Sequence, residues 1–265
     1  MAGSIVKNNS HKQIATIFDS PIVIKGRTWL PFTQLGVWAI MTFVDRRRHS
    51  ERSFPVQAAS GGLCTLVILG SEWCHNLAHA AAAWLVGKPM DQLYIQGGLP
   101  RCVYHAINDL TVTPHEHIIR SLGGPLCNVL TLPFWFLFKR ATQPDSLPRD
   151  VAEAGFTMNT FLSTVSLLPI PGIDGGSILK WLFVSRGKNL RSIPSELCNL
   201  EPCTWEAKVQ QADALVARVN RFSGAGLAAT SAVMFKKKRW LWASICALFA
   251  LLSWLVGYEV IKEQS

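Results

Sequence analysis

Apolar residues gather in long runs that lack Asp, Glu, Lys and Arg, and each run predicts a helix that spans a membrane. A span needs about 20 predominantly apolar residues. Five runs reach or approach this length, two of them interrupted by ionisable side chains: 28–44, 53–87, 121–138, 154–179 and 240–258. A sixth, shorter run covers 222–235. The pattern therefore predicts five or six spans.

The segments between the runs are more polar, and two of them predict structure of their own. Residues 92–96 alternate before Gly97 and Gly98, which favours a short strand. Residues 205–219 carry apolar side chains at helical spacing, which favours an amphipathic helix at the membrane interface. The predicted parts are a polar N-terminal segment (1–27), a first span (28–44), a transmembrane core (53–184), a polar loop with the amphipathic helix (185–221) and a C-terminal part with one or two spans (222–265).

Composition supports a multi-pass integral membrane protein. Hydrophobic residues make up 49% of the chain and charged residues 16%, against about 25% charged residues in soluble domains. The net charge of +9 includes basic clusters at 46–48 and 236–239, which indicate cytoplasmic ends by the positive-inside rule. A third basic cluster, formed by Arg186, Lys188 and Arg191, leaves the topology open. No basic stretch is interleaved with stacking aromatic residues, so membrane lipid is an expected partner and nucleic acid is not.

Seven cysteines are too few to form a disulfide scaffold in a chain of 265 residues, and their odd number leaves at least one without a partner in the chain. Cys198 and Cys203 form a C-x₄-C pattern in the predicted polar loop. In an oxidising compartment the two would form a disulfide, and in the cytoplasm they would stay free thiols.

Ionisable side chains interrupt two of the apolar runs, where each is costly and therefore a hypothesis of function. His75 and His79 are four residues apart, so a helix places them on one face, one turn apart, where they can hold one Zn²⁺. Asp174 lies in a segment rich in Pro and Gly and would complete a His₂Asp set with an open fourth position, the pattern of a catalytic zinc. Taken singly, the histidines are also consistent with a hydrogen-bonding pair and Asp174 with a turn former. Metal or proton transport stays a more distant alternative.

Three separated segments resemble motifs of the site-2 protease family, the intramembrane zinc metalloproteases. Residues 75–79 correspond to H-E-x-x-H, residues 124–128 to G-P-x-x-N, and residues 166–176 to N-L-L-P-x-P-x-L-D-G-G. The resemblance covers about residues 60–185. It implies an all-α polytopic membrane protein with a site-2-protease-like helical core, Zn²⁺ held by two His and one Asp, and cleavage of peptide bonds in or next to the spans of transmembrane protein substrates.

The chain departs from the family where the chemistry is performed. Asn76 stands at the position of the motif glutamate, and Ser166 at that of the first asparagine of the third motif. In the family the glutamate acts as general base, and an amide cannot accept a proton at neutral pH. Loss of a general base costs about 10²–10⁴-fold in rate. Two interpretations follow: a pseudoprotease that binds or regulates membrane proteins without cutting them, or an enzyme in which Glu72 has taken over the role.

Glu72 precedes Asn76 by one helical turn. A glutamate on a helix points back toward the helix N-terminus, so we expect the Glu72 carboxylate to point away from Asn76. The alternative role for Glu72 is a partner that fixes the ring of His75 or His79.

The Gly124-Pro125-x-x-Asn128 element corresponds in the family to a substrate-binding segment. The resemblance implies that Asn128 hydrogen-bonds the unwound backbone of a substrate. An interhelical hydrogen bond, which contributes about 0.6–2 kcal/mol, is the alternative.

Overall fold

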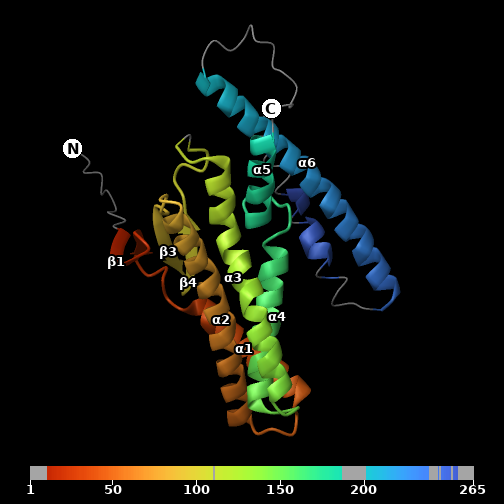
Figure 1. Ribbon diagram of the computed structural model, residues 1–265. Helices are drawn as coiled ribbons and strands as arrows, with labels where there is room; N and C mark the ends of the chain where they lie inside the picture. The colour runs from red at the N-terminus through yellow and green to blue at the C-terminus, as the bar shows by residue number, and fades with distance from the viewer. Residues whose placement is uncertain are drawn as a thin grey trace, which may run out of the picture. The chain divides into compact units, whose positions relative to one another are not determined.

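The computed structural model describes residues 11–109, 111–186, 201–238, 244, 246–251 and 253–255. It divides into two compact units, and each is described by itself: the first is Met1–Ile107 with Gly123–Ser163, the second Asn108–Leu122 with Thr164–Ser265. In chain order the elements are β1 (His11–Ile17), β2 (Ser20–Lys25), α1 (Phe32–Arg48), α2 (Phe54–Leu85), β3 (Gln92–Gln96), β4 (Leu99–Val103), α3 (Pro114–Ala141), α4 (Leu147–Val165), α5 (Asp174–Arg186) and α6 (Glu201–Lys236), labelled in Figure 1.

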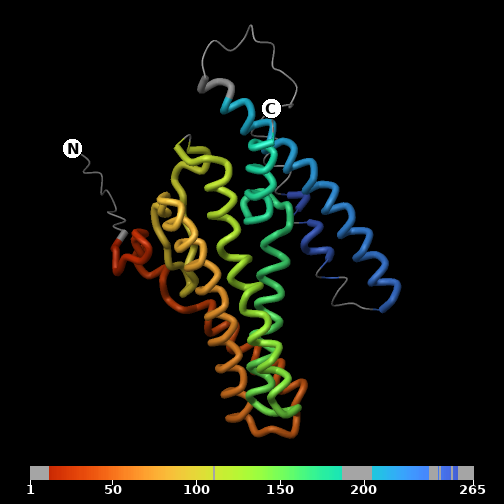
Figure 2. Tube along the Cα trace, in the orientation of Figure 1, coloured from red at the N-terminus to blue at the C-terminus, as the bar shows by residue number. Residues whose placement is uncertain are grey.

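A four-stranded sheet in the first unit corrects the all-α expectation. Its order is β1-β2-β3-β4, with β2 and β3 parallel and the other two pairs antiparallel. Figure 2 shows the N-terminal hairpin in red beside the hairpin that follows α2. The strand predicted at 92–96 is confirmed as β3. The two N-terminal strands come from the segment predicted only as polar, where Phe18 and Asp19 form the turn with φ of 49° and 55°, as a two-residue hairpin of type I′ requires.

The sheet packs on α2. Ala80 of α2, Met90 and Leu93 form a buried cluster, against which Trp73 packs. Trp73 also donates from its indole N–H to the carbonyl of Gly98, at the turn between β3 and β4. These contacts hold the second hairpin against the part of α2 that carries the two histidines.

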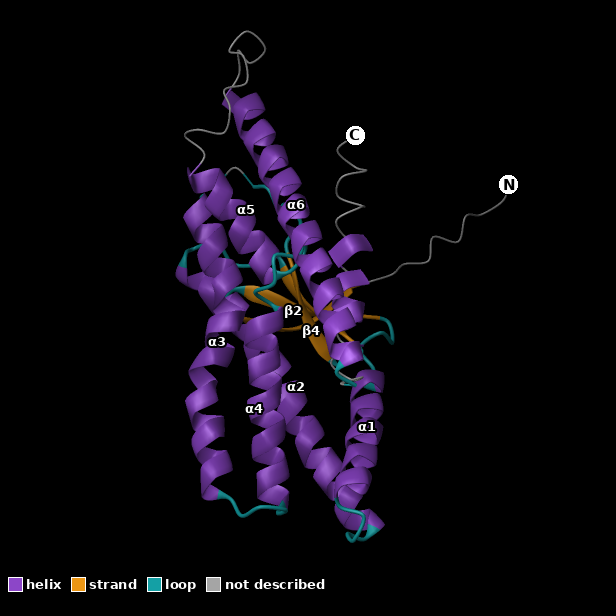
Figure 3. Cartoon of the chain, turned by 90° about the vertical axis from the view of Figure 1, so that its right-hand side faces the viewer, coloured by secondary structure: helices purple, strands orange, loops and turns teal. Residues whose placement is uncertain are grey.

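Helices α1, α2, α3 and α4 run along the first unit (Figure 3). Among the described residues, α2 and α3 are long and apolar enough to cross a membrane, and they overlap the predicted spans 53–87 and 121–138. Large side chains such as Leu66 of α2 and Leu130 of α3 are about two-thirds exposed, which suits contact with lipid better than with water.

The other predicted spans differ from these two. The run 28–44 overlaps α1, a helix of 17 residues that begins at Phe32 and ends at Arg48. The run 222–235 is part of the long helix α6. Within the run 240–258, the described residues 244, 246–251 and 253–255 are helical. Of the cysteine pair predicted in a loop, Cys198 lies outside the described residues, whereas Cys203 lies in the first turn of α6, which corrects the loop prediction there.

The run 154–179 is broken, as its prolines and glycines predict. Helix α4 ends at Val165 and α5 begins at Asp174. The segment between them contains Pro169 and Pro171, and Gly172 adopts φ of +85°, a conformation that favours glycine. The interruption ends the helix before the aspartate of the third motif.

The second unit has its own core between α5 and α6. Trp181 and Val184 of α5 are buried with Val209 and Ala212 of α6. The helix predicted at 205–219 is thus confirmed, and its apolar face packs on α5.

Candidate metal centre

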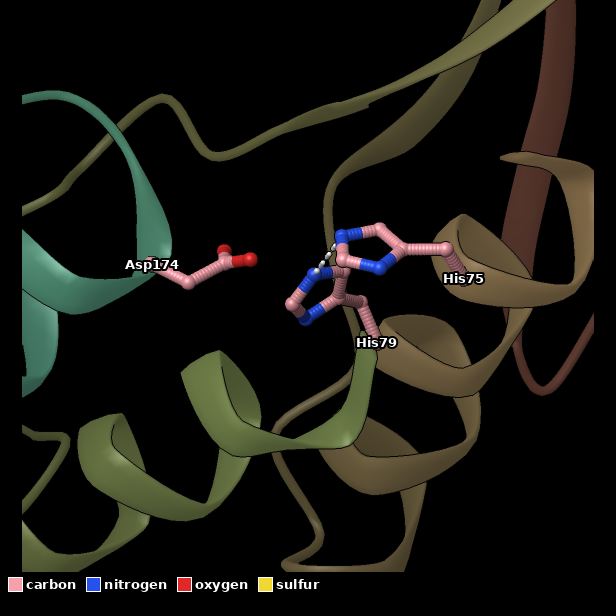
Figure 4. A group of neighbouring side chains, drawn as sticks. All are labelled: His75, His79 and Asp174. Carbon is pink, nitrogen blue, oxygen red and sulfur yellow. Dashed lines mark hydrogen bonds between the residues drawn. The ribbon is translucent and has the colours of Figure 1, made fainter. Parts of the chain in front are cut away.

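His75 and His79 lie side by side on α2. Their Nε2 atoms are 3.1 Å apart, and their rings meet edge to face with centroids 4.7 Å apart. Both side chains are buried, with exposures of 8% and 7%. Figure 4 shows the two imidazoles projecting from successive turns of the helix. The i, i+4 spacing therefore brings both Nε2 atoms to one point.

Asn128 fixes the ring of His75. The Nδ1 atom of His75 is 2.6 Å from Oδ1 of Asn128. The amide orientation of Asn128 is set in turn, because its Nδ2 donates to Oδ1 of Asn159. An oxygen therefore faces His75, Nδ1 carries the proton of the neutral ring, and Nε2 keeps its lone pair.

This series of hydrogen bonds begins at the buried amide of Asn159, which lies in α4. Its Nδ2 donates to Ser71 Oγ and to the Gly155 carbonyl, and its Oδ1 also accepts from Thr131. Sequence reasoning missed Asn159, although an amide inside an apolar run is a detectable signal.

Gly124 gives the two rings their space. A Cβ at this position would lie 2.4 Å from Nε2 of His79 and 2.6 Å from Cε1 of His75. The preceding residue, Gly123, would place a Cβ 2.5 Å from the carbonyl oxygen of Ala78. The glycine pair therefore allows α3 to approach the histidine face of α2, and Pro125 is fully buried at the same crossing.

Asn128 is fully buried. Its amide oxygen is bonded to His75 and its amide nitrogen to Asn159, so both ends of the amide have partners within the protein. This arrangement matches the interhelical hydrogen bond that the sequence left as the alternative to substrate binding.

Asn76 contacts Glu72, contrary to the expectation that the glutamate points away. Its Nδ2 donates to the Glu72 carbonyl at 3.0 Å and to Oε1 of the Glu72 carboxylate at 3.3 Å. Its Oδ1 accepts from the Cys102 thiol of β4 at 3.3 Å. The Asn76 amide thus reaches back over the preceding turn and contacts both the carbonyl and the carboxylate of Glu72. Cys102 was not found from the sequence, because its contact depends on how the hairpin packs.

Asp174 is the first residue of α5, in the second unit, and Figure 4 shows its side chain leaving that helix. A tight turn places it. The N–H of Gly175 donates to the Ser166 carbonyl at 2.7 Å, and a Cβ at Gly176 would lie 2.1 Å from the carbonyl oxygen of Ile170. The glycines after Asp174 thus let the turn fold closely on the start of its own helix.

The donor atoms of the histidine pair fit a metal ion. Two imidazole nitrogens 3.1 Å apart repel each other if both present lone pairs, so a proton or a cation must lie between them. Neutral imidazole is a preferred ligand of zinc, and metal binding displaces the proton that otherwise joins such a pair. Together, the buried His pair on an apolar helix and the ring oriented by an amide form a donor set that suits a metal ion.

Comparison with known proteins identifies the family. A protein of Methanocaldococcus jannaschii named as a putative zinc metalloprotease is 39% identical over 134 residues, which are 45% of this chain and 70% of that protein. The solved structure of the site-2 protease from the same organism superposes with a TM-score of 0.49, at 10% identity, over 94% of each chain. No protein-family model matches the chain. The chain belongs to the site-2 protease family of zinc metalloproteases.

Proposed function

We propose that the chain is an intramembrane zinc metalloprotease that cuts peptide bonds in or next to the spans of transmembrane proteins. The observation that carries the proposal is the 3.1 Å approach of the buried Nε2 atoms of His75 and His79. Asp174 is proposed as the third ligand, because it supplies the carboxylate of a His₂Asp set and follows the family-like Pro-x-Pro segment. Three protein ligands leave the open position that a catalytic zinc requires.

A bound zinc ion supplies Lewis-acid chemistry, polarising a carbonyl and making water more acidic. The residues of the chain supply the rest. The Asn128 amide keeps the His75 ring in the tautomer that presents Nε2. Both histidine side chains are buried, and burial strengthens electrostatic interactions at the reacting atoms.

Glu72 is proposed as the general base, the group that accepts a proton from the attacking water molecule. Its carboxylate lies one turn from the usual base position and touches the Asn76 amide. In this arrangement Asn76 donates to Glu72 and holds the carboxylate close to the site, while Oε1 is the atom that takes the proton. A displaced base retains part of the about 10²–10⁴-fold contribution of general base catalysis.

The second candidate function is that of a pseudoprotease, which binds membrane proteins without cutting them. It is favoured by the bonding of Asn76, whose amide is engaged by Glu72 on one side and by Cys102 on the other. An amide held in this way neither accepts a proton nor turns toward a water molecule.

Cleavage of a model transmembrane substrate in liposomes distinguishes the two functions. The wild type is compared with Asp174→Asn, Glu72→Gln and Asn76→Glu, and Glu206→Gln on the exposed face of α6 is the matched control. Zinc content is measured for each variant, so that loss of the metal is separated from loss of the base.

The proposed protease cuts as wild type, loses activity with its zinc in Asp174→Asn, and loses activity while keeping zinc in Glu72→Gln. Cleavage that begins only in Asn76→Glu supports the pseudoprotease. Full zinc content in Asp174→Asn contradicts the assignment of the third ligand.

A further inference from the structure

A second group of metal-ligating side chains lies in the first unit, where α1 ends and α4 begins. Asp45, His49 and Asp150 each offer one ligand atom, and these atoms lie within 4.8 Å of one another. All three side chains are about nine-tenths buried. Asp45 and His49 are four residues apart, the spacing that also pairs His75 with His79.

Arg52 and Ser60 donate hydrogen bonds to one edge of the two carboxylates. The Arg52 Nη1 atom is 2.7 Å from Asp45 Oδ1 and 2.6 Å from Asp150 Oδ2. Ser60 Oγ donates toward the same two oxygens, at 3.0 Å and 3.5 Å. The opposite oxygens, Oδ2 of Asp45 and Oδ1 of Asp150, are left to other partners.

The second carboxylate oxygen of Asp45 points to a bound ligand at this place. Oδ2 of Asp45 is buried and has no hydrogen-bond partner among the residues that the structure describes. A buried carboxylate oxygen without a partner is costly. An anion is excluded as the partner because the oxygen is itself negative, so the partner is a donor or a cation.

The charges of the ion pairs also favour binding of a cation. Two carboxylates face a single guanidinium, that of Arg52. The Arg52 guanidinium supplies one positive charge for two carboxylates.

His49 presents a ring nitrogen to the open edge. Its Nε2 is 3.4 Å from Oδ1 of Asp150, while its Nδ1 faces the exposed carboxylates of Glu51 at 3.5 Å and Asp145 at 4.0 Å. A carboxylate beside one nitrogen of a histidine orients the ring so that the other nitrogen can bind a metal. The backbone is fixed as well, because Gln57 donates to the carbonyls of His49 and Arg52.

A cavity of about 390 Å³ adjoins the cluster. Asp45 and Asp150 line it together with the ion-paired Arg48 and Glu153 and with mainly apolar side chains of α1, α2 and α4. The cavity gives an ion access and leaves room for water or another small ligand in its remaining coordination positions.

We propose that Asp45, His49 and Asp150 form a second metal site, which takes a divalent transition ion such as Zn²⁺. Two carboxylate oxygens and one imidazole nitrogen with open positions are a donor set that suits this class of ion. The site is separate from the histidine pair: Ser60 and His75 are 15 residues apart on α2, about 22 Å along the helix axis at 1.5 Å per residue. The proposal goes beyond the protease function and does not depend on it.

Zinc stoichiometry tests the site. The full chain in detergent is loaded with Zn²⁺, desalted and analysed for metal by mass spectrometry. The variants are His49→Gln, the double variant H75Q/H79Q and the combination of all three changes. His115→Gln, on an exposed side chain of α3, is the matched control. Thermal unfolding with and without Zn²⁺ checks that each variant is folded.

The expected zinc content is two equivalents for the wild type and the control, one for His49→Gln, one for H75Q/H79Q and none for the combination. Zinc should also raise the unfolding temperature of H75Q/H79Q, because the remaining ion joins α1 to α4. No zinc in folded H75Q/H79Q overturns the proposal, and this variant tests it even if His49→Gln fails to fold. Two equivalents in His49→Gln overturn it as well. One equivalent in the wild type, lost in H75Q/H79Q, overturns the second site and leaves the protease site intact.

Discussion

Asn128 and His75 are joined by a 2.6 Å hydrogen bond between Oδ1 of the amide and Nδ1 of the ring. The bond has a direction because Asn159 accepts from the other end of the Asn128 amide. A side chain in α4 thus decides, through α3, which nitrogen of a histidine in α2 is available to a metal. The polar side chains of Asn128 and Asn159 thus orient the ring of His75 in an otherwise apolar core.

Asn128→Ala should weaken zinc binding about 10–100-fold, because partners of this kind typically contribute that much to metal affinity. Competition with a chromophoric chelator measures the effect. Asn128→Asp is the matched variant, since it keeps an oxygen facing Nδ1 and should bind more tightly than Asn128→Ala. Equal affinity of wild type and Asn128→Ala would show that the ring is oriented by other contacts.

Gly124→Ala should displace the two histidine rings, because the new Cβ would lie 2.4 Å from His79 Nε2. Overpacking of this kind costs about 1–3 kcal/mol, and here the neighbours that must move are the ligands. We expect zinc content to fall while the helices stay folded, as followed by circular dichroism.

Gly70→Ala is the control for this change, since no atom lies within 4 Å of a Cβ at Gly70 in α2. The same substitution there should leave zinc content unchanged and favour the helix by about 1 kcal/mol. Unchanged zinc content in both variants would contradict a role of Gly124 in placing the rings.

Much of the helical order could be predicted from the sequence, because apolar runs and their breaks are local signals. The break between α4 and α5 follows from Pro169, Pro171 and Gly172, whose backbone limits need no tertiary context. The strands β1 and β2 could not be predicted with the same ease because both are short, and β2 is completed by parallel pairing with β3, about 70 residues away.

In the candidate site too, some residues could be predicted from local sequence, and others depend on tertiary contacts. His75 and His79 follow from a fixed spacing on one helix, whereas Asn159 and Cys102 act through contacts between elements that no spacing encodes. Asp45 directly follows the apolar run 28–44, and its distance of four residues from His49 is a metal-ligand spacing. Its significance depends on Asp150 and Arg52, which the fold brings beside it.

Asp213→Asn should destabilise the second unit. Lys180 of α5 is largely buried and donates to Asp213 at 2.8 Å and to Asn108 at 2.8 Å. Because Asp213 is about one-third exposed, the expected cost of losing its charge is about 1–3 kcal/mol, below that of breaking a fully buried pair. Thermal unfolding in detergent measures the change. Glu206→Gln, on the same helix and exposed, should leave the unfolding temperature as it is.

Asn76→Glu should couple with Glu72→Gln, because the Asn76 amide now donates to the Glu72 carboxylate at 3.3 Å. A glutamate at position 76 would replace that donor by a second negative charge one turn away, and like charges at this spacing are destabilising. Asn76→Glu alone should therefore lower the unfolding temperature of the metal-free protein.

Adding Glu72→Gln to Asn76→Glu restores a donor beside the new carboxylate and should recover the lost stability. A double-mutant cycle should give a coupling free energy of about 0.5–3 kcal/mol, the range found for residues in contact. The cycle is measured in the presence of a chelator, so that metal binding does not mask the repulsion. Additive effects of the two substitutions would mean that the side chains do not interact, and Glu72 would then have no means of acting at the position that Asn76 occupies.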